Sequence, residues 1–321
     1  MRISVVIPVY DEEESVDLLH TSLAQALNPL PNHSWEVIFV DDGSTDGSLD
    51  RLRQLAQQDA EHVTVVSLRR NFGQTAAIAA GIDYSHGDII VLMDADLQND
   101  PADISLLVEK IEQGYDVVSG WRRNRQDTFL TRTLPSRIAN GLISFVTGVH
   151  LHDYGCTLKA YRREVITGFR LYGEMHRFIP AYASSVGARI VEIPVRHHAR
   201  KYGKTKYGLG RTLKVILDLF TVKFLMSYAQ KPIYIFGGTG LFFIGLSFLT
   251  VFVLIIRRLT LDEHMIRSPL LLLSAMLFIL GFQSVLMGLQ AEVLARTYHE
   301  SQHKPIYTVK SVIRSREETE L

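Results

Sequence analysis

Two carboxylates and one amide follow a short apolar segment of the chain. Asp94, Asp96 and Gln98 come directly after residues 89–93. Oxygen ligands of this kind suit a hard divalent cation, and Mg²⁺ usually keeps substrate phosphates and waters in its shell. The pattern therefore predicts a site for a metal-bound diphosphate. The alternative is helix capping, because Asp100-Pro101 has the form of a helix start, but the position at a strand end favours the metal site.

Other phosphate-binding and zinc-binding patterns are absent or incomplete. No apolar segment is followed by Gly-x-Gly-x-x-Gly, and Gly203-Lys204-Thr205 lacks the preceding P-loop glycine, since His198 holds that position. His299 to His303 matches the zinc-protease pattern, but Lys304-Pro305 ends any helix there and no further histidine follows. The sequence therefore argues against a dinucleotide oxidoreductase, a P-loop ATPase and a zinc protease.

Short apolar segments rich in β-branched residues alternate with helix-length stretches. These segments are residues 3–8, 36–40, 63–68, 89–93 and 116–119. The alternation is typical of an α/β domain with a mainly parallel, Rossmann-like sheet. Polar residues follow several of the segments, and open α/β sheets bind ligands at the carboxyl ends of their strands. We therefore expect the acidic side chains to collect at one edge of the sheet.

Charge is distributed unevenly along a chain whose formal net charge is zero. Residues 1–116 hold 6 basic and 21 acidic side chains, a net charge of −15, whereas residues 117–230 hold 19 and 6, a net charge of +13. Acidic and basic regions of this kind are suited to cations and to phosphates or anionic lipid, respectively. The balanced total argues against a strongly basic nucleic-acid binder but conceals these two halves, and no nucleic-acid partner is expected. The single cysteine, Cys156, cannot form an intrachain disulfide.

Two uncharged stretches of 24 residues each, 233–256 and 268–291, are long enough to cross a membrane. We expect residues 231–294 to form a transmembrane hairpin, joined by the 11 residues 257–267. Two buried helices of a soluble domain are the alternative. Small residues recur every seventh position and favour close helix approach. They are Gly238 and Gly245 on the first helix, and Ser274, Gly281 and Gly288 on the second.

A helical hairpin places both flanking parts of the chain on the same side of the membrane. That side should be the cytoplasm, because residues 1–10 do not resemble a signal peptide and basic residues are more frequent beside the inner ends of the spans. Residues 209–230 combine apolar residues at helical spacing with basic ones and predict an interfacial amphipathic helix, with a core-facing helix as the alternative. Residues 1–208 would form the catalytic domain and residues 295–321 a cytosolic tail.

Several motifs in fixed order resemble family 2 glycosyltransferases. They are Ile7-Pro8-Val9-Tyr10-Asp11-Glu12, Val40-Asp41-Asp42-Gly43-Ser44, Asn71-Phe72-Gly73-Gln74 and Asp94-Ala95-Asp96-Leu97-Gln98. With Asp153-Tyr154-Gly155-Cys156, the stretch 200–207 and two C-terminal spans, the chain resembles polyprenyl-phosphate glycosyltransferases. The bacterial undecaprenyl-phosphate glucosyltransferases and the dolichol-phosphate mannose synthases belong to this group. The resemblance implies a GT-A fold and covers nearly the whole chain.

The resemblance implies a site for a nucleotide-sugar donor and for Mg²⁺ or Mn²⁺. The donor-binding residues it implies are Pro8, Tyr10, Glu12, Asp41, Asp42, Asp94, Ala95, Arg200 and Lys206. Of these, Pro8, Tyr10 and Glu12 would hold the nucleobase and ribose, with a helix-capping turn as the alternative. Asp94, Asp96 and Gln98 fall on metal and diphosphate positions, and Asp96 and Gln98 would be the direct ligands.

The resemblance also implies an acceptor site for a lipid phosphate, formed by Arg122, Arg132 and Ser136. A solvated basic helix is the alternative. Asp153 falls on the position of the catalytic aspartate, where it would act as a general base, orient the acceptor or stabilise positive charge on the sugar. A phosphate monoester is largely ionised at neutral pH, because its second pKa is about 6. Little proton removal by a general base is therefore needed before the phosphate attacks.

These implications lead to one expected reaction, the inverting transfer of glucose from UDP-glucose to undecaprenyl phosphate. Alternatives are another sugar on the same acceptor, such as an aminoarabinose derivative, N-acetylhexosamine or mannose, and an inactive membrane scaffold. Residues 173–178 should help to select the sugar and look more like the glucosyltransferase branch than the aminoarabinose branch. The absence of Gln-x-x-Arg-Trp argues against polysaccharide synthesis. A homo-oligomer is also expected from the resemblance.

Overall fold

The structure is a computed structural model that describes residues 1–123, 134–167, 175–199, 232–261 and 268–301. It divides into two compact units, residues 1–222 and residues 223–321. The proposed interfacial helix at 209–230 and the part of the tail after residue 301 lie outside the described residues. The two units are therefore considered separately.

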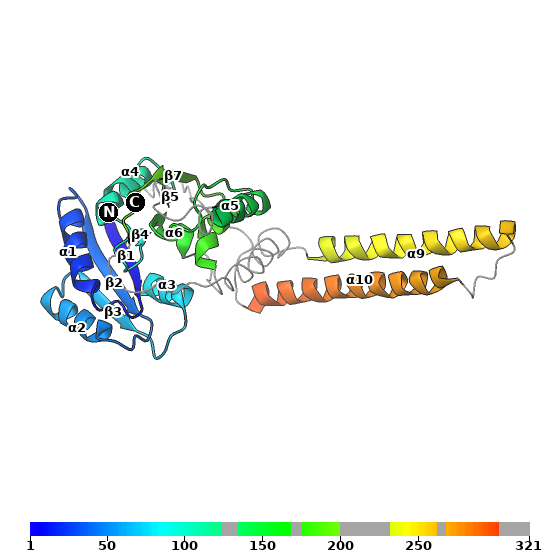
Figure 1. The fold of residues 1–321 in the computed structure, drawn as a ribbon, viewed down its shortest axis with the longest axis horizontal. Coiled ribbons are helices and arrows are strands. Elements are labelled where there is room, and N and C mark those ends of the chain that lie inside the picture. Colours follow the sequence, from blue (N-terminus) through cyan, green and yellow to red (C-terminus); the bar gives the residue numbers. More distant parts are fainter. Residues whose placement is uncertain (124–133, 168–174, 200–231, 262–267, 302–321) are drawn as a thin grey trace, which may run out of the picture. The chain divides into compact units, whose positions relative to one another are not determined.

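The described part of the first unit is built on one mixed sheet (Figure 1). The strands are β1 (Arg2–Val9), β2 (Ser34–Asp41), β3 (Val63–Ser67), β4 (Ile89–Leu92), β5 (Val117–Trp121), β6 (Lys159–Arg162) and β7 (Ile190–Pro194), in the spatial order β3-β2-β1-β4-β6-β5-β7. Neighbouring strands pair in parallel except where β6 meets β4 and β5. The predicted mainly parallel α/β sheet is confirmed.

Helices cover both faces of this sheet. Side chains of α1 (Val16–Leu27), α2 (Ser48–Gln58) and α4 (Ile104–Glu112) join one apolar cluster, and those of α3 (Gln74–Asp83), α6 (Arg163–Ile166) and α7 (Ile179–Ser185) join another. The 3₁₀ helices η1 (Pro101–Asp103) and η3 (Met175–Phe178) and the helix α5 (Leu134–Thr147) complete the described elements of this unit. The arrangement is a sheet between two helical layers.

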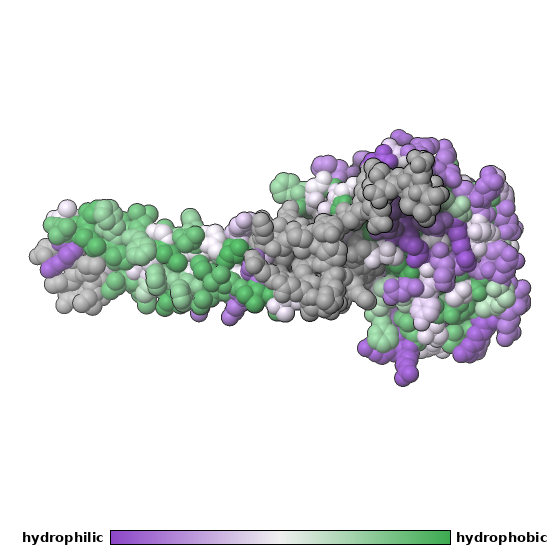
Figure 2. Space-filling model, turned by 180° about the vertical axis from the view of Figure 1, so that it is seen from behind, coloured by the Kyte–Doolittle hydropathy of each residue, from purple (hydrophilic) through white to green (hydrophobic). Residues whose placement is uncertain are grey.

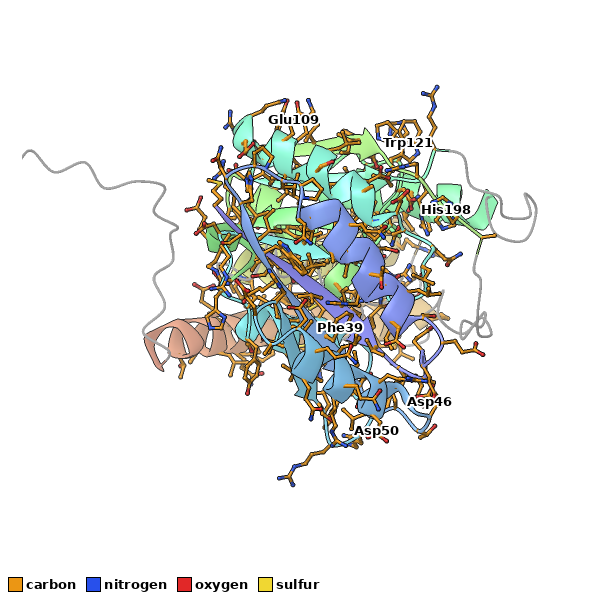
Figure 3. All side chains as sticks on the ribbon, turned by 90° about the vertical axis from the view of Figure 1, so that its left-hand side faces the viewer. Phe39, Asp46, Asp50, Glu109, Trp121 and His198 are labelled. Carbon is orange, nitrogen blue, oxygen red and sulfur yellow. The ribbon has the colours of Figure 1, made fainter. Side chains whose placement is uncertain are left out.

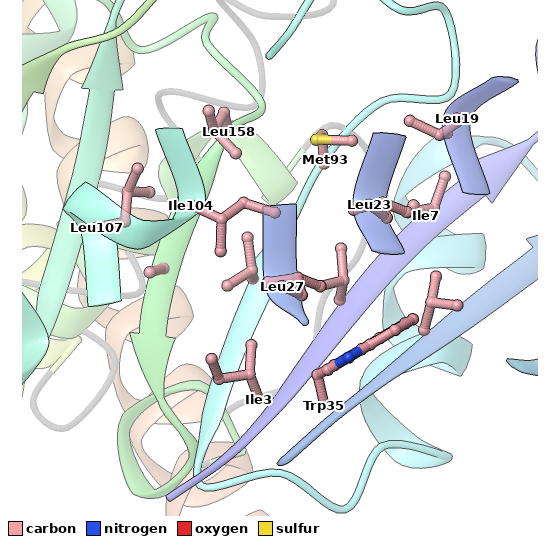
Figure 4. Packing of buried hydrophobic residues seen from close by; sticks show 14 of the residues in the cluster. Ile3, Ile7, Leu19, Leu23, Leu27, Trp35, Met93, Ile104, Leu107 and Leu158 are labelled. Carbon is pink, nitrogen blue, oxygen red and sulfur yellow. The ribbon is translucent and has the colours of Figure 1, made fainter. Parts of the chain in front are cut away.

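Strand alternation explains how β1 supplies both layers. Ile3, Val5 and Ile7 face the α1 side, whereas Val6 faces the α3 side, and all four are fully buried. On the first side, Leu19, Leu23 and Leu27 repeat every four residues along α1 and pack over β1 (Figure 4). This packing fixes the carboxyl ends of the strands, where the candidate site residues begin.

Two strands of the sheet were not predicted. The five predicted segments all form strands, but β6 and β7 are additional. The four residues of β6 include Lys159 and Arg162, and β7 includes Glu192 and Pro194. β6 reads Lys-Ala-Tyr-Arg and shows no apolar pattern, so its pairing depends on partners elsewhere in the chain. β7 reads Ile-Val-Glu-Ile-Pro, and its β-branched residues were a signal that the prediction overlooked.

The second unit contains two long apolar helices, α9 (Ile233–Leu261) and α10 (Pro269–Ser301). Each is long and apolar enough to cross a membrane, over Ile233–Thr260 and Pro269–Leu294. Only 17% and 11% of their most apolar windows are buried, which argues against core helices of a soluble protein. Figure 2 shows hydrophobic side chains across the visible face of this pair. The first helix continues beyond the predicted end at residue 256, through Arg257 and Arg258.

The two long helices touch at a glycine crossing. A Cβ at Gly240 would lie 2.6 Å from the backbone oxygen of Gly281, and one at Gly281 would lie 2.7 Å from that of Gly240. Ser247 Oγ donates to the carbonyl of Ser274 at 2.7 Å. The prediction was right for Gly281, Gly288 and Ser274 but wrong for the first helix. Gly238 and Gly245 face open space among the described residues, and Gly240 makes the contact instead.

Candidate active site

The ends of β1 and β2 bring the predicted nucleoside residues together. Val9 is the register partner of Asp41, and the backbone N–H of Asp42 donates to the Val9 carbonyl at 2.8 Å. Pro8, Tyr10 and Glu12 are half-buried at this edge. Glu12 also supports the start of α1, because its carboxylate accepts from Ser15 Oγ at 3.2 Å. The capping alternative therefore describes part of what this segment does.

The two adjacent aspartates have different surroundings. Asp42 accepts hydrogen bonds from the backbone N–H groups of Phe72 and Gly73, at 2.8 and 2.9 Å. Burial raises its pKa, against these two hydrogen bonds. Asp41 accepts longer bonds, at 3.2 Å from the Ser44 N–H and at 3.4 Å from Ser67 Oγ. Asp42 thus shapes the loop before α3, and Asp41 is the better candidate for contact with a nucleoside.

Asp94 is held by two side chains that had no predicted role. Gln74 Nε2 donates to one carboxylate oxygen at 2.7 Å, and Thr157 Oγ1 donates to the other at 2.8 Å. Gln74 begins α3, while Thr157 lies just before β6, so two separate segments orient this group. Gln74 belongs to the Asn71–Gln74 motif, so the sequence could have indicated a role for it in the site. Thr157 had no such signal.

The next residues make a tight turn. Leu97 has a φ of 59°, a left-handed conformation that few non-glycine residues adopt. The turn is closed by the backbone N–H of Gln98, which donates to the Asp96 carboxylate at 3.1 Å. Ala95 is buried at 4% exposure, whereas Asp96 and Gln98 are half-buried. Asp96 and Gln98 can therefore supply oxygens to a ligand from the same turn. Asp94 is already hydrogen-bonded to Gln74 and Thr157.

Electrostatics at this turn favour a cation. Burial, and secondly the charge of Asp96, raise the pKa of Asp94 to about 6, although Thr157, Arg122 and Arg177 act in the opposite direction. A divalent ion beside Asp96 would relieve this repulsion. Among the described residues, no group of three or more His, Cys, Asp or Glu side chains could hold a metal by itself. Gln98 and diphosphate oxygens would complete the shell, as Mg²⁺ permits.

Two residues with different predicted roles form one ion pair. Arg122, directly after β5, donates from Nε to Asp153 Oδ2 at 2.7 Å and from Nη2 to Asp153 Oδ1 at 3.0 Å. The two side chains are only 15% and 4% exposed. Burial would lower the pKa of Arg122, but the hydrogen bonds and charge of Asp153 outweigh it and raise that pKa. Both groups are therefore charged and oriented by each other.

Part of the predicted sugar-selecting stretch lies near Asp94. His176, in η3, is buried and its Nδ1 is 2.7 Å from Thr75 Oγ1, next to Gln74. The charge of the adjacent Arg177 acts on Asp94. Residues 173 and 174 lie outside the described residues.

The remaining predicted site residues are not placed. Arg132, Arg200 and Lys206 lie outside the described residues, and Ser136 is on α5 but its side chain is not described. In the described part, Asp46, His198 and Trp121 mark one side of the domain in Figure 3. His198 contacts the Asp94–Gln98 turn, because its backbone N–H donates to the Gln98 carbonyl at 2.8 Å.

The chain matches one family model and full-length relatives. Residues 4–169 match the family Glycosyl transferase family 2. The chain is 44% identical to a dodecaprenyl-phosphate galacturonate synthase of Rhizobium johnstonii, over 97% of this chain and 93% of the relative. It is 40% identical to an undecaprenyl-phosphate 4-deoxy-4-formamido-L-arabinose transferase of Edwardsiella ictaluri, over 99% and 96% of the two chains.

A solved structure has a similar fold. The glucosyl-3-phosphoglycerate synthase from Mycobacterium tuberculosis, in complex with Mg²⁺ and uridine diphosphate, matches 70% of this chain and 79% of its own, with a TM-score of 0.52. The sequence identity is 20%, so this likeness concerns the fold alone.

Proposed function

We propose that this chain, which belongs to glycosyl transferase family 2, transfers a sugar from a nucleoside-diphosphate donor to a polyprenyl phosphate at a membrane. The chain is a glycosyltransferase with the GT-A fold, and the relatives that match nearly its whole length are polyprenyl-phosphate glycosyltransferases. One arrangement carries the proposal. The Asp94–Gln98 turn follows β4, and Arg122, which pairs with Asp153, follows β5 of the same sheet. The chain also has two helices long and apolar enough to cross a membrane.

The proposed reaction exchanges one C–O bond for another. A phosphate oxygen of the acceptor attacks the anomeric carbon of the donor sugar, and the bond from that carbon to the nucleoside diphosphate breaks. The leaving diphosphate keeps the bonding electrons, and attack from the opposite face inverts the anomeric centre. Mg²⁺ or Mn²⁺, held by Asp96 and Gln98, would stabilise the negative charge of the leaving diphosphate. Asp94 would orient this turn through its bonds to Gln74 and Thr157.

The acceptor side is proposed to act by positioning rather than by proton removal. The Arg122 guanidinium would bind the acceptor phosphate with the N–H groups not directed at Asp153, and Asp153 would fix its orientation. Because the phosphate is largely ionised at neutral pH, with a second pKa of about 6, no general base is required. Asp153 would then serve mainly as the partner that holds Arg122 in place.

The glucose donor expected from the sequence finds no support in these relatives. They are named for galacturonate and 4-deoxy-4-formamido-L-arabinose, which agrees in part with the alternative of another sugar on the same acceptor. We therefore propose a uridine-linked galacturonate as the first donor to test and the formamido-arabinose donor as the second. The higher identity to the galacturonate synthase, 44% against 40%, sets this order.

The membrane arrangement remains part of the proposal. The helices α9 and α10 would span the bilayer as a hairpin, with residues 1–208 and the tail on the cytoplasmic side, where nucleotide sugars are available. The excess of basic residues near the inner ends of the spans supports this orientation. Assembly into a homo-oligomer stays a prediction.

A donor screen tests the function. Purified full-length protein in detergent would receive undecaprenyl phosphate and one uridine-linked sugar at a time, with Mg²⁺ or Mn²⁺, and the lipid product would be identified by mass. We expect a hexuronate or pentose adduct and release of UDP that depends on both lipid and metal. Asp96→Asn should lose this transfer. Absence of lipid adducts with every donor, or full activity of Asp96→Asn, would contradict the proposal.

A further inference from the structure

The turn that carries Asp153 is held by two charged side chains of opposite sign. We propose that Glu192 of β7 and Lys159 of β6 are positioning residues that fix the turn Asp153–Cys156, and with it the Arg122–Asp153 pair. The consequence for sugar transfer rests on the proposed function. We call the contacts of Glu192 and Lys159 with this turn the clamp. The clamp is a property of the described residues and can be tested without any assay of sugar transfer.

Glu192 binds the backbone N–H groups at the start of the turn. Its Oε1 accepts from the N–H of His152 at 2.9 Å and from that of Asp153 at 3.0 Å. Its Oε2 lies 2.7 Å from His152 Nδ1, and the His152 ring stacks on Trp121 with a centroid distance of 4.4 Å. The Glu192 side chain is only 10% exposed, although its partner His152 is 69% exposed, so these charge-assisted bonds lie at the edge of the domain.

Lys159 binds the carbonyl groups at the other end of the turn. Its ammonium donates to the carbonyl of Tyr154 at 3.2 Å and to that of Cys156. Lys159 is 3% exposed, and both of these hydrogen bonds of its ammonium are made to backbone oxygens. A buried ammonium on carbonyls and a half-buried carboxylate on N–H groups match the polarity of each backbone group. Neither contact involves a substrate.

The sheet explains why two strands can hold the same turn. Ser119 of β5 is the register partner of both Lys159 on β6 and Glu192 on β7. Residues opposite one another in neighbouring strands project to the same face, so the two charges lie in one row across three strands. Ser119 is fully buried and small. Trp121 ends the same strand two residues after Ser119, and Arg122 follows it directly.

Helix α5 supports the segment immediately before the turn. Asn140 Nδ2 donates to the carbonyl of His152 at 2.7 Å, and Ser144 Oγ donates to that of Leu151 at 3.4 Å. The segment from Leu151 to Cys156 is thus bound at successive backbone groups, and Asp153 is oriented within it. Movement of the turn would separate the Asp153 carboxylate from the Nε and Nη2 atoms of Arg122.

The single cysteine gives a direct probe of this turn. Cys156 is 1% exposed, and burial raises the pKa of its thiol to about 11. The native thiol should therefore react slowly with N-ethylmaleimide. Reaction of the full-length protein in detergent can be followed by mass, and no other cysteine contributes to the signal. The labelling rate reports opening of the turn whether or not the protein transfers sugar.

Glu192→Met removes these three contacts with His152 and Asp153, whereas Glu192→Gln keeps an oxygen for the two backbone N–H groups. We expect Glu192→Met to label about tenfold faster or more, since a hydrogen bond to a charged group is lost. Glu192→Gln should remain closer to the wild type, and Lys159→Met should resemble Glu192→Met. The matched control is Glu36→Met, because Glu36 is another buried carboxylate, bonded to Ser4 and the His86 N–H.

The outcomes separate the clamp from the function. Faster labelling in Glu192→Met than in Glu36→Met, with a larger fall in kcat/KM for the lipid phosphate than in binding of UDP with Mn²⁺, supports the proposal. Equal labelling in the wild type and Glu192→Met, or equally fast labelling in Glu36→Met, overturns it. If the wild type transfers no sugar, the proposed function fails while the labelling rates still decide the clamp.

Discussion

Replacement of Asp94 by asparagine should make the metal-free protein more stable while it removes donor turnover. Burial and the neighbouring charge of Asp96 raise the pKa of Asp94 from 3.8 to about 6. The ionised carboxylate is therefore disfavoured in the folded protein relative to the unfolded chain. Asparagine has nearly the same shape and no charge, so it removes this penalty at neutral pH.

The size and direction of the effect follow from the two pKa values. The difference between 3.8 and about 6 corresponds to about 3 kcal/mol, at about 1.4 kcal/mol for each pKa unit. The Asp94 side chain is half-buried, and solvent screens part of the effect, so we expect Asp94→Asn to raise the free energy of unfolding by about 2 kcal/mol at neutral pH. Between about pH 4 and pH 6 the folded state binds more protons than the unfolded state, so wild-type stability falls as pH rises. The asparagine variant lacks this fall.

Urea unfolding with tryptophan fluorescence provides the assay. The only tryptophans, Trp35 and Trp121, both lie in the first unit, so the signal reports that unit in the full-length protein in detergent with EDTA. The stability advantage of Asp94→Asn should grow from pH 4 to pH 7. The altered contact with Thr157 adds an offset that does not change with pH. Added Mg²⁺ should stabilise only the wild type.

A surface carboxylate serves as the control for this experiment. Asp50 is 77% exposed and pairs with Arg53 on α2 at 3.0 Å, so Asp50→Asn should show no pH-dependent gain. A difference between Asp94→Asn and the wild type that stays flat from pH 4 to pH 7 would refute the reasoning. It would mean that the Asp94 charge carries no penalty in the folded protein.

Three shorter predictions follow from other contacts. Gln74→Leu removes the 2.7 Å bond to Asp94, and we expect sugar transfer to fall by about tenfold with unchanged thermal unfolding; an unaffected rate would exclude this support role. Gly281→Leu should lower the unfolding temperature of the hairpin by clashing with Gly240, whereas Gly238→Leu, which faces open space, should not, and equal effects would contradict the crossing. Chelation should stop UDP release, and Mg²⁺ or Mn²⁺ should restore it; activity that persists in EDTA would count against the metal site.

Local sequence patterns predicted the elements that have a clear apolar pattern of their own. The five apolar segments and the two long apolar helices are of this kind. β6 could not be predicted in this way, because Lys159 and Arg162 flank only two less polar residues, whereas the β-branched residues of β7 were a usable signal interrupted by Glu192. Their charges are accommodated by backbone groups of a turn from a third segment. Pairing of that kind depends on the folded sheet and leaves no local periodicity.

The candidate site was predictable as a set of residues but not as a set of contacts. The order of motifs identified Asp94, Asp96, Arg122 and Asp153, yet the bidentate pair joins two residues 31 positions apart. Spacing along the chain cannot show this, since the contact joins the end of β5 to the loop between α5 and β6. Asp42 illustrates the reverse case. It was predicted to bind a nucleoside, but its carboxylate bonds are made to the backbone before α3.

The structure also changes the meaning of the two charged regions. Arg196, from the basic region, pairs with Asp100 at 3.0 Å and with Asp103 at 2.8 Å, so these two acidic side chains are compensated within the protein. Asp94 and Asp96 lie only a few residues earlier, but among the described residues no basic nitrogen lies within 4.0 Å of either carboxylate. Among the described residues, the Asp94–Gln98 turn therefore has no direct ion pair, although the more distant charges of Arg122 and Arg177 act on Asp94. A divalent cation would supply positive charge between these carboxylates and a diphosphate, and no arginine would have to leave an existing partner.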